Sequence, residues 1–328
     1  MAKILHHLSL ILIGTILNSL LGLIFYVLVA RNLEVSGFGY FSFLLGVGIL
    51  VAEISDLGSS SALIKFGTKD RFGSIFSLTV IHRILASILI FIGLWAGPSA
   101  FVAVSLLLVS LITQSFVALQ KYPALVATNI LGNLIRLGLT FYLISVGMLT
   151  PVSAIGIFAL ANFIAFVFGA ILLAKLKGLT FFRFDQARII FPEVFAYSRN
   201  IAISFGMSSV SAKIDVPIIY FLGGPTTVGL YSSAQKLTSV LSQLAGAIEN
   251  VFSPKFSNGG NIAHHFKDYF LINGLFAGLL ILAIPFTGFL VPLIFGEKYI
   301  LAIGVLNLLL AGLALFFLTG PLTAFILY

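Results

Sequence analysis

The chain has 328 residues, of which 60% are hydrophobic and only 9% charged, with a net charge of +8 and no cysteine. Soluble domains carry about 25% charged residues, and the mean hydropathy of this chain is +1.16, so a soluble globular protein is excluded. Without cysteine there can be no disulfide, thiolate metal site, iron–sulfur cluster or cysteine nucleophile.

Ten stretches are apolar for long enough to cross a bilayer as helices. The hydrocarbon core is about 30 Å thick and needs about 20 helical residues. Lipid cannot hydrogen-bond to bare backbone, and the period-two alternation of a transmembrane barrel is missing, so helices are expected. We predict an all-α, polytopic membrane protein with spans at 8–30, 38–61, 73–96, 98–119, 124–148, 151–174, 200–222, 227–252, 269–292 and 300–323.

The basic residues sort by side of the membrane. With the N-terminus inside, the inner face carries twelve Lys and Arg residues, whereas the outer loops hold only Arg31 and Lys298. The positive-inside rule then places both termini in the cytoplasm. The surplus charge is explained by topology and by attraction to anionic lipids, so nucleic acid is not expected as a partner.

The longest loop, 175–199, mixes basic residues with phenylalanines and isoleucines, as an amphipathic segment on the inner headgroup layer does. We expect it to be a cytoplasmic linker between an N-terminal six-helix lobe, 1–174, and a C-terminal lobe, 200–328. The second lobe has only four predicted helices, so a truncated second bundle is expected.

The two lobes share a weak internal repeat. An offset of 190 aligns residues 38–66 with 228–256 and matches Gly39 with Gly229, Ser42 with Ser232, and Lys65-Phe66 with Lys255-Phe256. Parallel duplication is a recognised transporter architecture. We therefore predict two repeated helical bundles, the second incomplete.

Polar residues at helical spacing give four predicted spans a polar face. They are Gly46, Glu53, Asp56 and Ser60 in the second span, Asn129, Asn133, Arg136 and Thr140 in the fifth, Asn200, Ser204, Ser208, Ser211 and Asp215 in the seventh, and Ser232, Lys236, Ser239 and Gln243 in the eighth. Such faces are costly against lipid, and we expect them to converge on an aqueous cavity. The alternative is packing through interhelical hydrogen bonds, worth about 0.6 kcal/mol each.

Four cations lie within spans, namely Arg83, Arg136, Lys213 and Lys236. Each costs about 2.5–3.5 kcal/mol near the middle of the membrane unless it is paired or hydrated. A cationic cavity favours an anionic substrate, and the planar guanidinium of arginine suits phosphate. We expect Arg136, Lys236 and at least one of the other two cations to share a central cavity.

Asp215, Glu53 and Asp56 are the available counter-charges, and they are expected to balance charge or to couple ions. Lys236 is a candidate partner for Asp215. The alternative interpretation is a set of buried ion pairs that holds helices in register. Pro217 removes the donor to the carbonyl of Lys213, so a kink is predicted there, acting as a hinge or as a static bend.

Motifs of enzymes are missing from the chain. It contains no phosphate-binding loop, no HExxH and no GxSxG. The pairs His6-His7 and His264-His265 point about 100° apart on a helix, which disfavours a metal site. No catalytic residue, metal or cofactor is expected.

Two stretches resemble a known family. Residues 28–66, LVARNLEVSGFGYFSF…DLGSSSALIKF, are similar to the first periplasmic loop and second helix of the polysaccharide and O-antigen flippases of the multidrug/oligosaccharidyl-lipid/polysaccharide exporter superfamily. Residues 214–257, IDVPIIYFLGGPTTVGLYSSAQKL…NVFSPKFS, are similar to their seventh and eighth helices.

This resemblance implies two helical lobes around a cationic cavity that opens alternately to each side of a bacterial or archaeal cell membrane. It implies as substrate an undecaprenyl-pyrophosphate-linked oligosaccharide for O-antigen, capsule or exopolysaccharide assembly. Membrane lipids, a polysaccharide polymerase and glycosyltransferases are the other expected partners. The alternatives are a cation-coupled drug exporter of the same fold, a membrane-embedded glycosyltransferase or polymerase for the same carrier, and a non-transporting scaffold.

Overall fold

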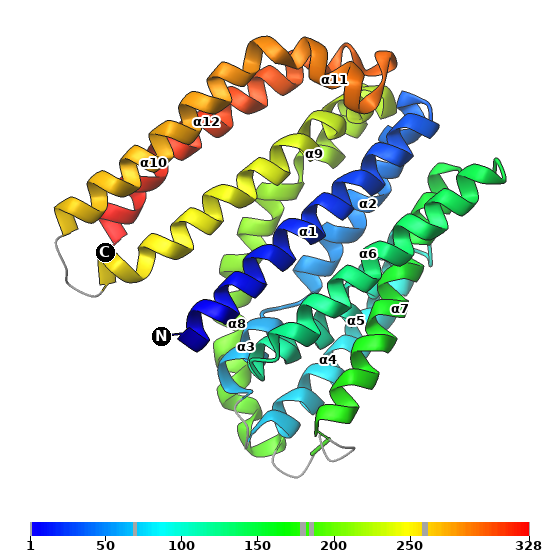
Figure 1. Ribbon diagram of the computed structural model, residues 1–328. Coiled ribbons are helices and arrows are strands. Elements are labelled where there is room, and N and C mark those ends of the chain that lie inside the picture. Colours follow the sequence, from blue (N-terminus) through cyan, green and yellow to red (C-terminus); the bar gives the residue numbers. More distant parts are fainter. Residues whose placement is uncertain (1, 68–70, 178–181, 184–186, 258–261, 328) are drawn as a thin grey trace.

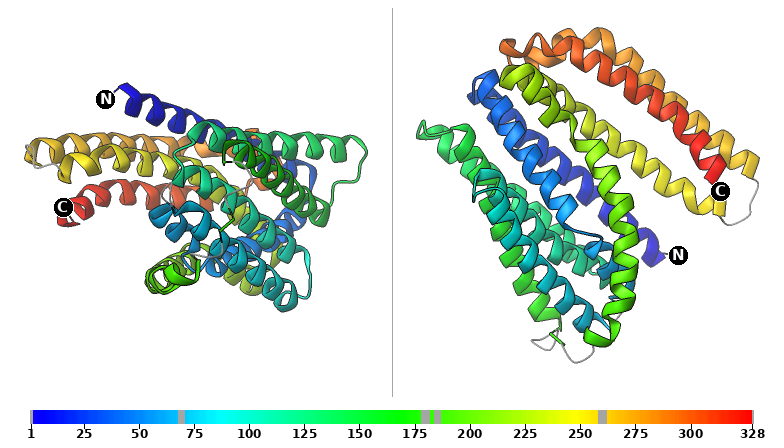
Figure 2. Two further views of the ribbon diagram at one scale, coloured as in Figure 1. Left: turned by 90° about the horizontal axis from the view of Figure 1, so that it is seen from below. Right: turned by 180° about the vertical axis from the view of Figure 1, so that it is seen from behind.

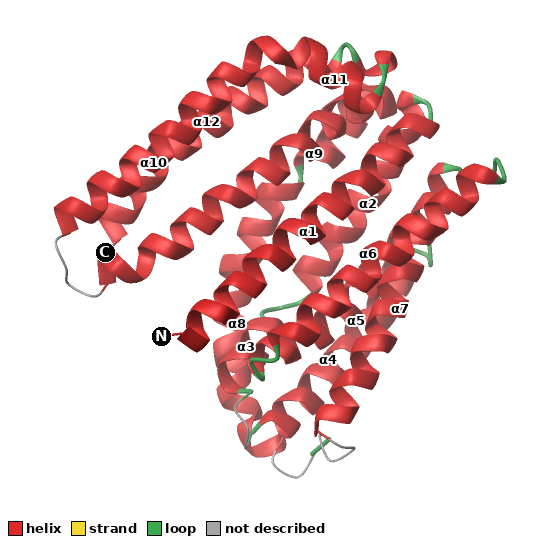
Figure 3. Ribbon diagram, viewed as in Figure 1, coloured by secondary structure: helices red, strands yellow, loops and turns green. Residues whose placement is uncertain are grey.

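The protein is a bundle of long helices in the computed structural model (Figure 1). The backbone is described for residues 2–67, 71–177, 182–183, 187–257 and 262–327. Side chains are described within these ranges from residue 13 onward, apart from 177, 205, 208, 244–257, 262–265 and 321–327. Every regular element in the described ranges is a helix (Figure 3), which confirms the all-α prediction.

The helices are long and follow one another through short connections. They are α1 (Ala2–Asn32), α2 (Val35–Ser55), α3 (Ser59–Phe66), α4 (Phe72–Gly93), α5 (Pro98–Ala118), α6 (Tyr122–Ser145), α7 (Pro151–Lys177), α8 (Ala187–Lys213), α9 (Asp215–Ser257), α10 (Ile262–Ala283), α11 (Thr287–Phe295) and α12 (Ala302–Leu327), with 3-10 turns η2 (Ile284–Phe286) and η3 (Glu297–Tyr299).

Within the described part of the chain, eight helices are long and apolar enough to cross a membrane. They become nine if the bent pair Ala187–Ser204 and Ser209–Gln243 forms one span. Ten spans were predicted, and the difference lies at the seventh and eighth of them, 200–222 and 227–252. The chain forms α8 and α9 there, with a break at Ile214 inside the predicted seventh span and a turn at Gly224, which lies in the predicted gap between the two spans.

α9 changes direction at Gly224, whose φ of 76° and ψ of 177° are not helical. That conformation is essentially restricted to glycine. Asp215 precedes the turn and accepts hydrogen bonds from Tyr231 and from Gln235 Nε2 (2.8 Å), which follow it. The two limbs of α9 therefore lie side by side.

The break between α8 and α9 falls at Ile214. Pro217 lies in the first turn of α9, and its missing N–H leaves the carbonyl of Lys213 without its helical donor. The interruption occurs where Pro217 predicts it. The role of this proline as a hinge stays a prediction.

The predicted span 38–61 is interrupted between α2 and α3. Leu57 (φ 45°) and Gly58 (φ 73°) adopt left-handed conformations, which end a right-handed helix. The carboxylate of Asp56 then accepts hydrogen bonds from the backbone N–H (3.2 Å) and hydroxyl (2.7 Å) of Ser60. An acidic side chain at a helix N-terminus is favourable, so Asp56 stabilises the start of α3.

The helices form two groups that meet at one end of the molecule (Figure 2). α10, α12 and the second limb of α9 pack together, and α1, α2 and α4 to α7 make the other group. The groups approach at the end that carries α11 and separate toward the end that carries both termini (Figure 1). A buried apolar cluster with Phe25, Phe38, Phe41, Phe295 and Tyr299 joins them at the meeting end.

Two cations hold the meeting end together, and we call this pair the end lock. Arg31 Nε donates to the carbonyl of Ile294 (2.8 Å), and its Nη2 donates to that of Leu293. Lys298 Nζ donates to the carbonyls of Arg31 (2.9 Å) and Leu33. Helix C-termini leave carbonyls without donors and attract cations, so each cation stabilises the end of a helix from the opposite group.

Tyr299 completes this contact. Its phenol donates a hydrogen bond of 3.1 Å to the carbonyl of Ala30. Burial, and then the carboxylate of Glu34, raise the pKa of Tyr299 above its ordinary value. The phenol therefore keeps its proton and can donate throughout the neutral pH range.

α2 and α9 cross at paired glycines. A Cβ atom at Gly39 would lie 1.7 Å from the carbonyl oxygen of Pro225, and one at Gly229 would lie 2.1 Å from that of Val35. The offset of 190 relates Val35 to Pro225 and Gly39 to Gly229, so the two contacts are equivalent. A two-fold symmetric interface has this reciprocity. It supports the predicted repeat, whose lobe boundaries stay a prediction.

Candidate functional site

Two adjoining cavities lie between the helix groups. The first, which we call the cationic cavity, has a volume of about 240 Å³ and is lined by Asn18, Tyr26, Asn133, Arg136 and Lys236 among others, from α1, α6 and α9. The second, the side cavity, has a volume of about 430 Å³ and is lined by Ser42, Lys213, Asp215, Ser232, Gln235 and Lys236 among others. Lys236 and Ser239 line both, so the two cavities are neighbours.

Arg136 is held by neutral groups. Its Nη1 donates to Asn133 Oδ1 (2.9 Å), and its Nη2 donates to Asn162 Oδ1 (3.0 Å). The guanidinium carbon lies 4.0 Å from the ring centre of Phe158 and 5.3 Å from that of Phe25. No carboxylate among the described residues forms an ion pair with it. Its positive charge is therefore not cancelled locally.

The two asparagines that bind Arg136 are themselves hydrogen-bonded to further polar residues. Asn133 Nδ2 donates to Asn18 Oδ1 (2.5 Å), and Asn162 Nδ2 donates to Ser105 Oγ (3.4 Å). Helical spacing puts Asn133 and Arg136 on one face of α6, as predicted. Asn162 was not predicted as a site residue, although a lone amide in an apolar span is a recognisable signal.

Lys236 also has no acidic partner among the residues that the structure describes. Its Nζ lies 4.0 Å from the ring centre of Tyr26, as a cation–π contact. The predicted pairing of Lys236 with Asp215 is wrong. Asp215 instead accepts hydrogen bonds from Tyr231 and Gln235, because these residues face it across the turn of α9.

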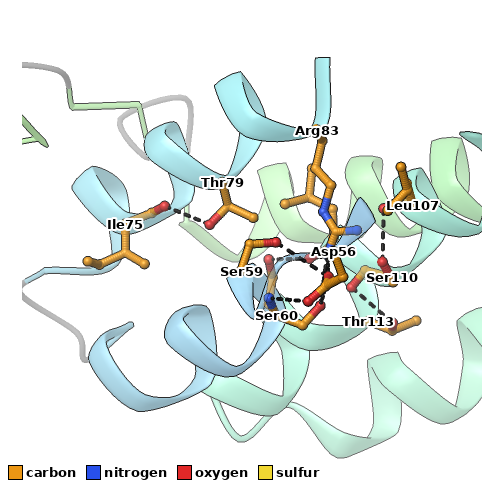
Figure 4. Close-up of polar contacts among 11 residues, drawn as sticks. Asp56, Ser59, Ser60, Ile75, Thr79, Arg83, Leu107, Ser110 and Thr113 are labelled. Carbon is orange, nitrogen blue, oxygen red and sulfur yellow. Dashed lines mark hydrogen bonds and ion pairs between the residues drawn. The ribbon is translucent and has the colours of Figure 1, made fainter. Parts of the chain in front are cut away.

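Arg83 lies apart from the other three cations. It lines a third cavity of about 790 Å³ between α2, α3, α4, α5, α6 and α8, which we call the polar cavity. The Arg83 side chain is 1% exposed, forms an ion pair with Asp56 and donates to Ser60 Oγ (2.8 Å), as Figure 4 shows. Glu53 lines the same cavity.

The structure thus brings Arg136, Lys236 and Lys213 to adjoining cavities and places Arg83 with Asp56 and Glu53 elsewhere. Tyr26, Phe25 and Phe158, whose rings face the cations, were not predicted. No sequence signal distinguishes them from the many other aromatic residues of the chain. A cavity with cations and hydrogen-bonding amides can bind a multiply charged anion such as a diphosphate.

Comparison with known proteins identifies the family. A family model described as polysaccharide biosynthesis protein matches residues 4–259, and comparison with curated proteins gave no match. Among solved structures, the fold is similar to an inward-facing multidrug resistance MATE family transporter of the MOP superfamily, with a TM-score of 0.62, 17% identity, and coverage of 93% of this chain and 78% of that chain.

A second solved structure, of a MATE mutant, is similar with a TM-score of 0.58 and 14% identity, and the match covers 97% of this chain and 82% of that one. Identities this low establish the fold alone. The family match confirms the resemblance seen in the sequence. The chain belongs to the polysaccharide biosynthesis protein family, as a multi-pass membrane protein with a MATE-like fold.

Proposed function

We propose that the protein flips an undecaprenyl-pyrophosphate-linked oligosaccharide across a bacterial or archaeal cell membrane by alternating access, without breaking a bond of the substrate. The observation that carries the proposal is the placement of Arg136 and Lys236. Both line the cationic cavity between the helix groups, and no carboxylate among the described residues pairs with either.

A diphosphate crossing about 30 Å of hydrocarbon needs compensating positive charge on its route. An uncompensated ion in that medium costs several kcal/mol. Arg136 and Lys236, with Lys213 in the neighbouring side cavity, supply that charge, whereas Asp215 limits the net charge or couples an ion. With a cytoplasmic N-terminus, the end where the helix groups separate faces the cytoplasm, where such carriers are loaded with sugar.

The test is complementation of a flippase-deficient strain by Arg136→Gln and Lys236→Gln, singly and together. We expect normal expression and melting temperature but no complementation. Arg188→Gln is the matched control, because Arg188 is exposed in α8 and lies outside the three cavities. Complementation by the double variant at normal expression would refute the cationic-cavity mechanism.

If these cations served only to hold helices together, a different pattern would appear. Each single variant would lower the melting temperature, because Arg136 would no longer bridge Asn133 and Asn162 and Lys236 would no longer lie over Tyr26. Melting curves of the purified variants therefore separate a structural role from transport.

A cation-coupled drug exporter is the second candidate, because the similar solved structure is a multidrug resistance transporter. A cationic drug is repelled by Arg136 and Lys236, which disfavours this function. Efflux of a cationic dye from cells that express the protein, at a rate unchanged by Arg136→Gln, would favour it over flipping. An enzyme acting on the same lipid carrier is disfavoured by the missing catalytic motifs.

A further inference from the structure

We propose that the polar cavity binds the saccharide part of the substrate, while the cationic cavity and side cavity bind its diphosphate. This inference rests on the proposed function and divides the substrate between two places. The polar cavity has a volume of about 790 Å³, within the range of about 300–1,000 Å³ typical of small-ligand sites. It is large enough for a sugar unit.

The charge of the polar cavity disfavours a diphosphate. Two carboxylates, those of Glu53 and Asp56, line it together with one cation, Arg83, and like charges repel in a medium of low dielectric constant. A metal ion is not favoured either, because no group of three Asp, Glu or His side chains comes together among the described residues. A neutral ligand rich in hydroxyl groups suits this lining.

The remaining polar lining offers both donors and acceptors. Gln114 and Asn129 carry amides, and Ser61 and Ser209 carry hydroxyls, for which the described part of the chain supplies no hydrogen-bond partner. Glu53 is exposed in the same cavity and is likewise unpaired. Amides, hydroxyls and a carboxylate together match the mixed donors and acceptors of sugar hydroxyls.

Arg83 gives the strongest sign of a ligand. Its Nη2 bonds to Asp56 and Ser60, as the dashed lines of Figure 4 show. Its Nε and Nη1, which carry three of the five guanidinium N–H donors, have no partner among the described residues although the side chain is 1% exposed. Buried donors are nearly always paired, and hydroxyl oxygens of a saccharide in this cavity would pair them.

The two parts of the site are neighbours. Ile49 of α2 lines both the side cavity and the polar cavity. Gly46 lines the side cavity and Glu53 the polar cavity, and at 1.5 Å per residue they lie about 10 Å apart along α2. One substrate can therefore place its diphosphate and its first sugar in the two cavities at once.

The experiment compares four lipids on the purified full-length protein in mild detergent. They are undecaprenyl diphosphate without sugar and the same lipid carrying one glucose, galactose or N-acetylglucosamine, each measured by displacement of a fluorescent undecaprenyl diphosphate. We expect at least one sugar lipid to bind about tenfold more tightly than the bare lipid, as one or two added hydrogen bonds would give.

Two variants test the assignment, Glu53→Gln and the double change Gln114→Ala, Asn129→Ala. Both are expected to reduce the tenfold sugar preference to about one, with binding of bare undecaprenyl diphosphate unchanged. Glu34→Gln is the matched control, because Glu34 precedes α2 at its opposite end and makes no side-chain cap. Should the double variant unfold, Ser61→Ala is measured instead, with a smaller loss of preference expected.

The outcomes separate this inference from the proposed function. If bare undecaprenyl diphosphate does not bind the wild type, the proposed function fails. If it binds but no sugar improves affinity, or if the variants keep the full sugar preference, the polar cavity is not a saccharide site and the proposed function stands.

Discussion

Arg83 and Arg136 are both arginines inside the bundle, and they are stabilised in different ways. Arg83 forms an ion pair with Asp56, whereas Arg136 is bound by two asparagine oxygens and lies 4.0 Å from the ring centre of Phe158. Cation–π contacts contribute about 0.5–2 kcal/mol. Neutral groups of this kind stabilise a guanidinium without cancelling its charge, so Arg136 can still attract an anion.

The buried ion pair of Arg83 with Asp56 is expected to be sensitive to the loss of its acid. Asp56→Asn leaves the Arg83 guanidinium, 1% exposed, without a counter-charge, and we expect the free energy of unfolding to fall by about 3 kcal/mol or more. Adding Arg83→Gln should recover most of this loss. Denaturant titration in mild detergent measures both effects.

The control is the pair of Arg71 with Glu193, whose atoms lie 3.5 Å apart with both side chains 54% exposed. Exposed pairs contribute about 0–1 kcal/mol, so Glu193→Gln should change stability very little. Equal effects of Asp56→Asn and Glu193→Gln would show that burial does not set the strength of these pairs.

The sequence predicted which charged residues lie at membrane depth, but it did not predict the partners of these residues. Lys236 and Asp215 line the same cavity without forming an ion pair. Tyr231 and Gln235 donate hydrogen bonds to the Asp215 carboxylate instead. Helical spacing gives the angular position of a side chain around the axis of its own helix. It does not give the rotation of one helix against another, which decides the pairing.

Among the elements, α2 and α9 make the closest approach, and it depends on glycine. Gly39→Ala would place a methyl group 1.7 Å from the carbonyl oxygen of Pro225. Backbone cannot move as a flexible side chain does, so α2 and α9 must separate. We expect Gly39→Ala, and equally Gly229→Ala, to cost about 1–3 kcal/mol, measured as a lower melting temperature.

Gly278→Ala in α10 is the matched control, because no described atom outside the neighbouring backbone of α10 lies within 4 Å of the added Cβ. Alanine is a better helix former than glycine by about 1 kcal/mol, so this change should raise the melting temperature or leave it unchanged. A similar loss in all three variants would contradict close packing of α2 on α9.

Hydropathy located most of the helices and the gap that contains Gly224, but it missed two interruptions. The span predicted at 38–61 breaks at Leu57 and Gly58, between Asp56 and Ser59. The span predicted at 200–222 breaks at Ile214, which only Pro217 indicated. Transfer free energy depends on side chains, whereas these breaks depend on backbone angles.

The end lock joins the two helix groups at one end of the molecule, and on the proposed alternating-access mechanism it must release for the protein to open there. Replacing Arg31 and Lys298 by Gln removes the cations from the carbonyls at the ends of α1 and α11. Each of the two cations contributes about 0.3–1 kcal/mol, so the population open at this end should rise about three- to thirtyfold.

A cysteine at Ser232, which lines the side cavity, reports this opening because the chain has no cysteine of its own. Its labelling by an impermeant maleimide on intact cells should accelerate by the same factor. Arg188→Gln with Lys267→Gln, both exposed, is the control and should leave the rate unchanged. An unchanged rate in the end-lock variant would mean that other contacts hold this end.

The orientation in the membrane is tested in the same cysteine-free background. Trp95→Cys lies at a 93% exposed position between α4 and α5, and Lys121→Cys lies in the next loop along the chain. The distribution of basic residues puts the loop between α5 and α6, which contains Lys121, on the cytoplasmic side. We expect an impermeant maleimide added to intact cells to label the cysteine at position 95 and not the one at position 121. The reverse pattern would contradict the predicted orientation.

The fold class, most of the helices and the charged residues at membrane depth could all be predicted from the amino-acid sequence, because they follow from transfer free energies and from periodicity along one chain. Which of these charged residues meet depends on how the helices pack. Arg136 and Lys236 share a cavity, whereas Arg83 forms a separate pair with Asp56. The reason is that contacts between helices depend on their rotation, their breaks and the close approach of α2 to α9, which no single helix specifies.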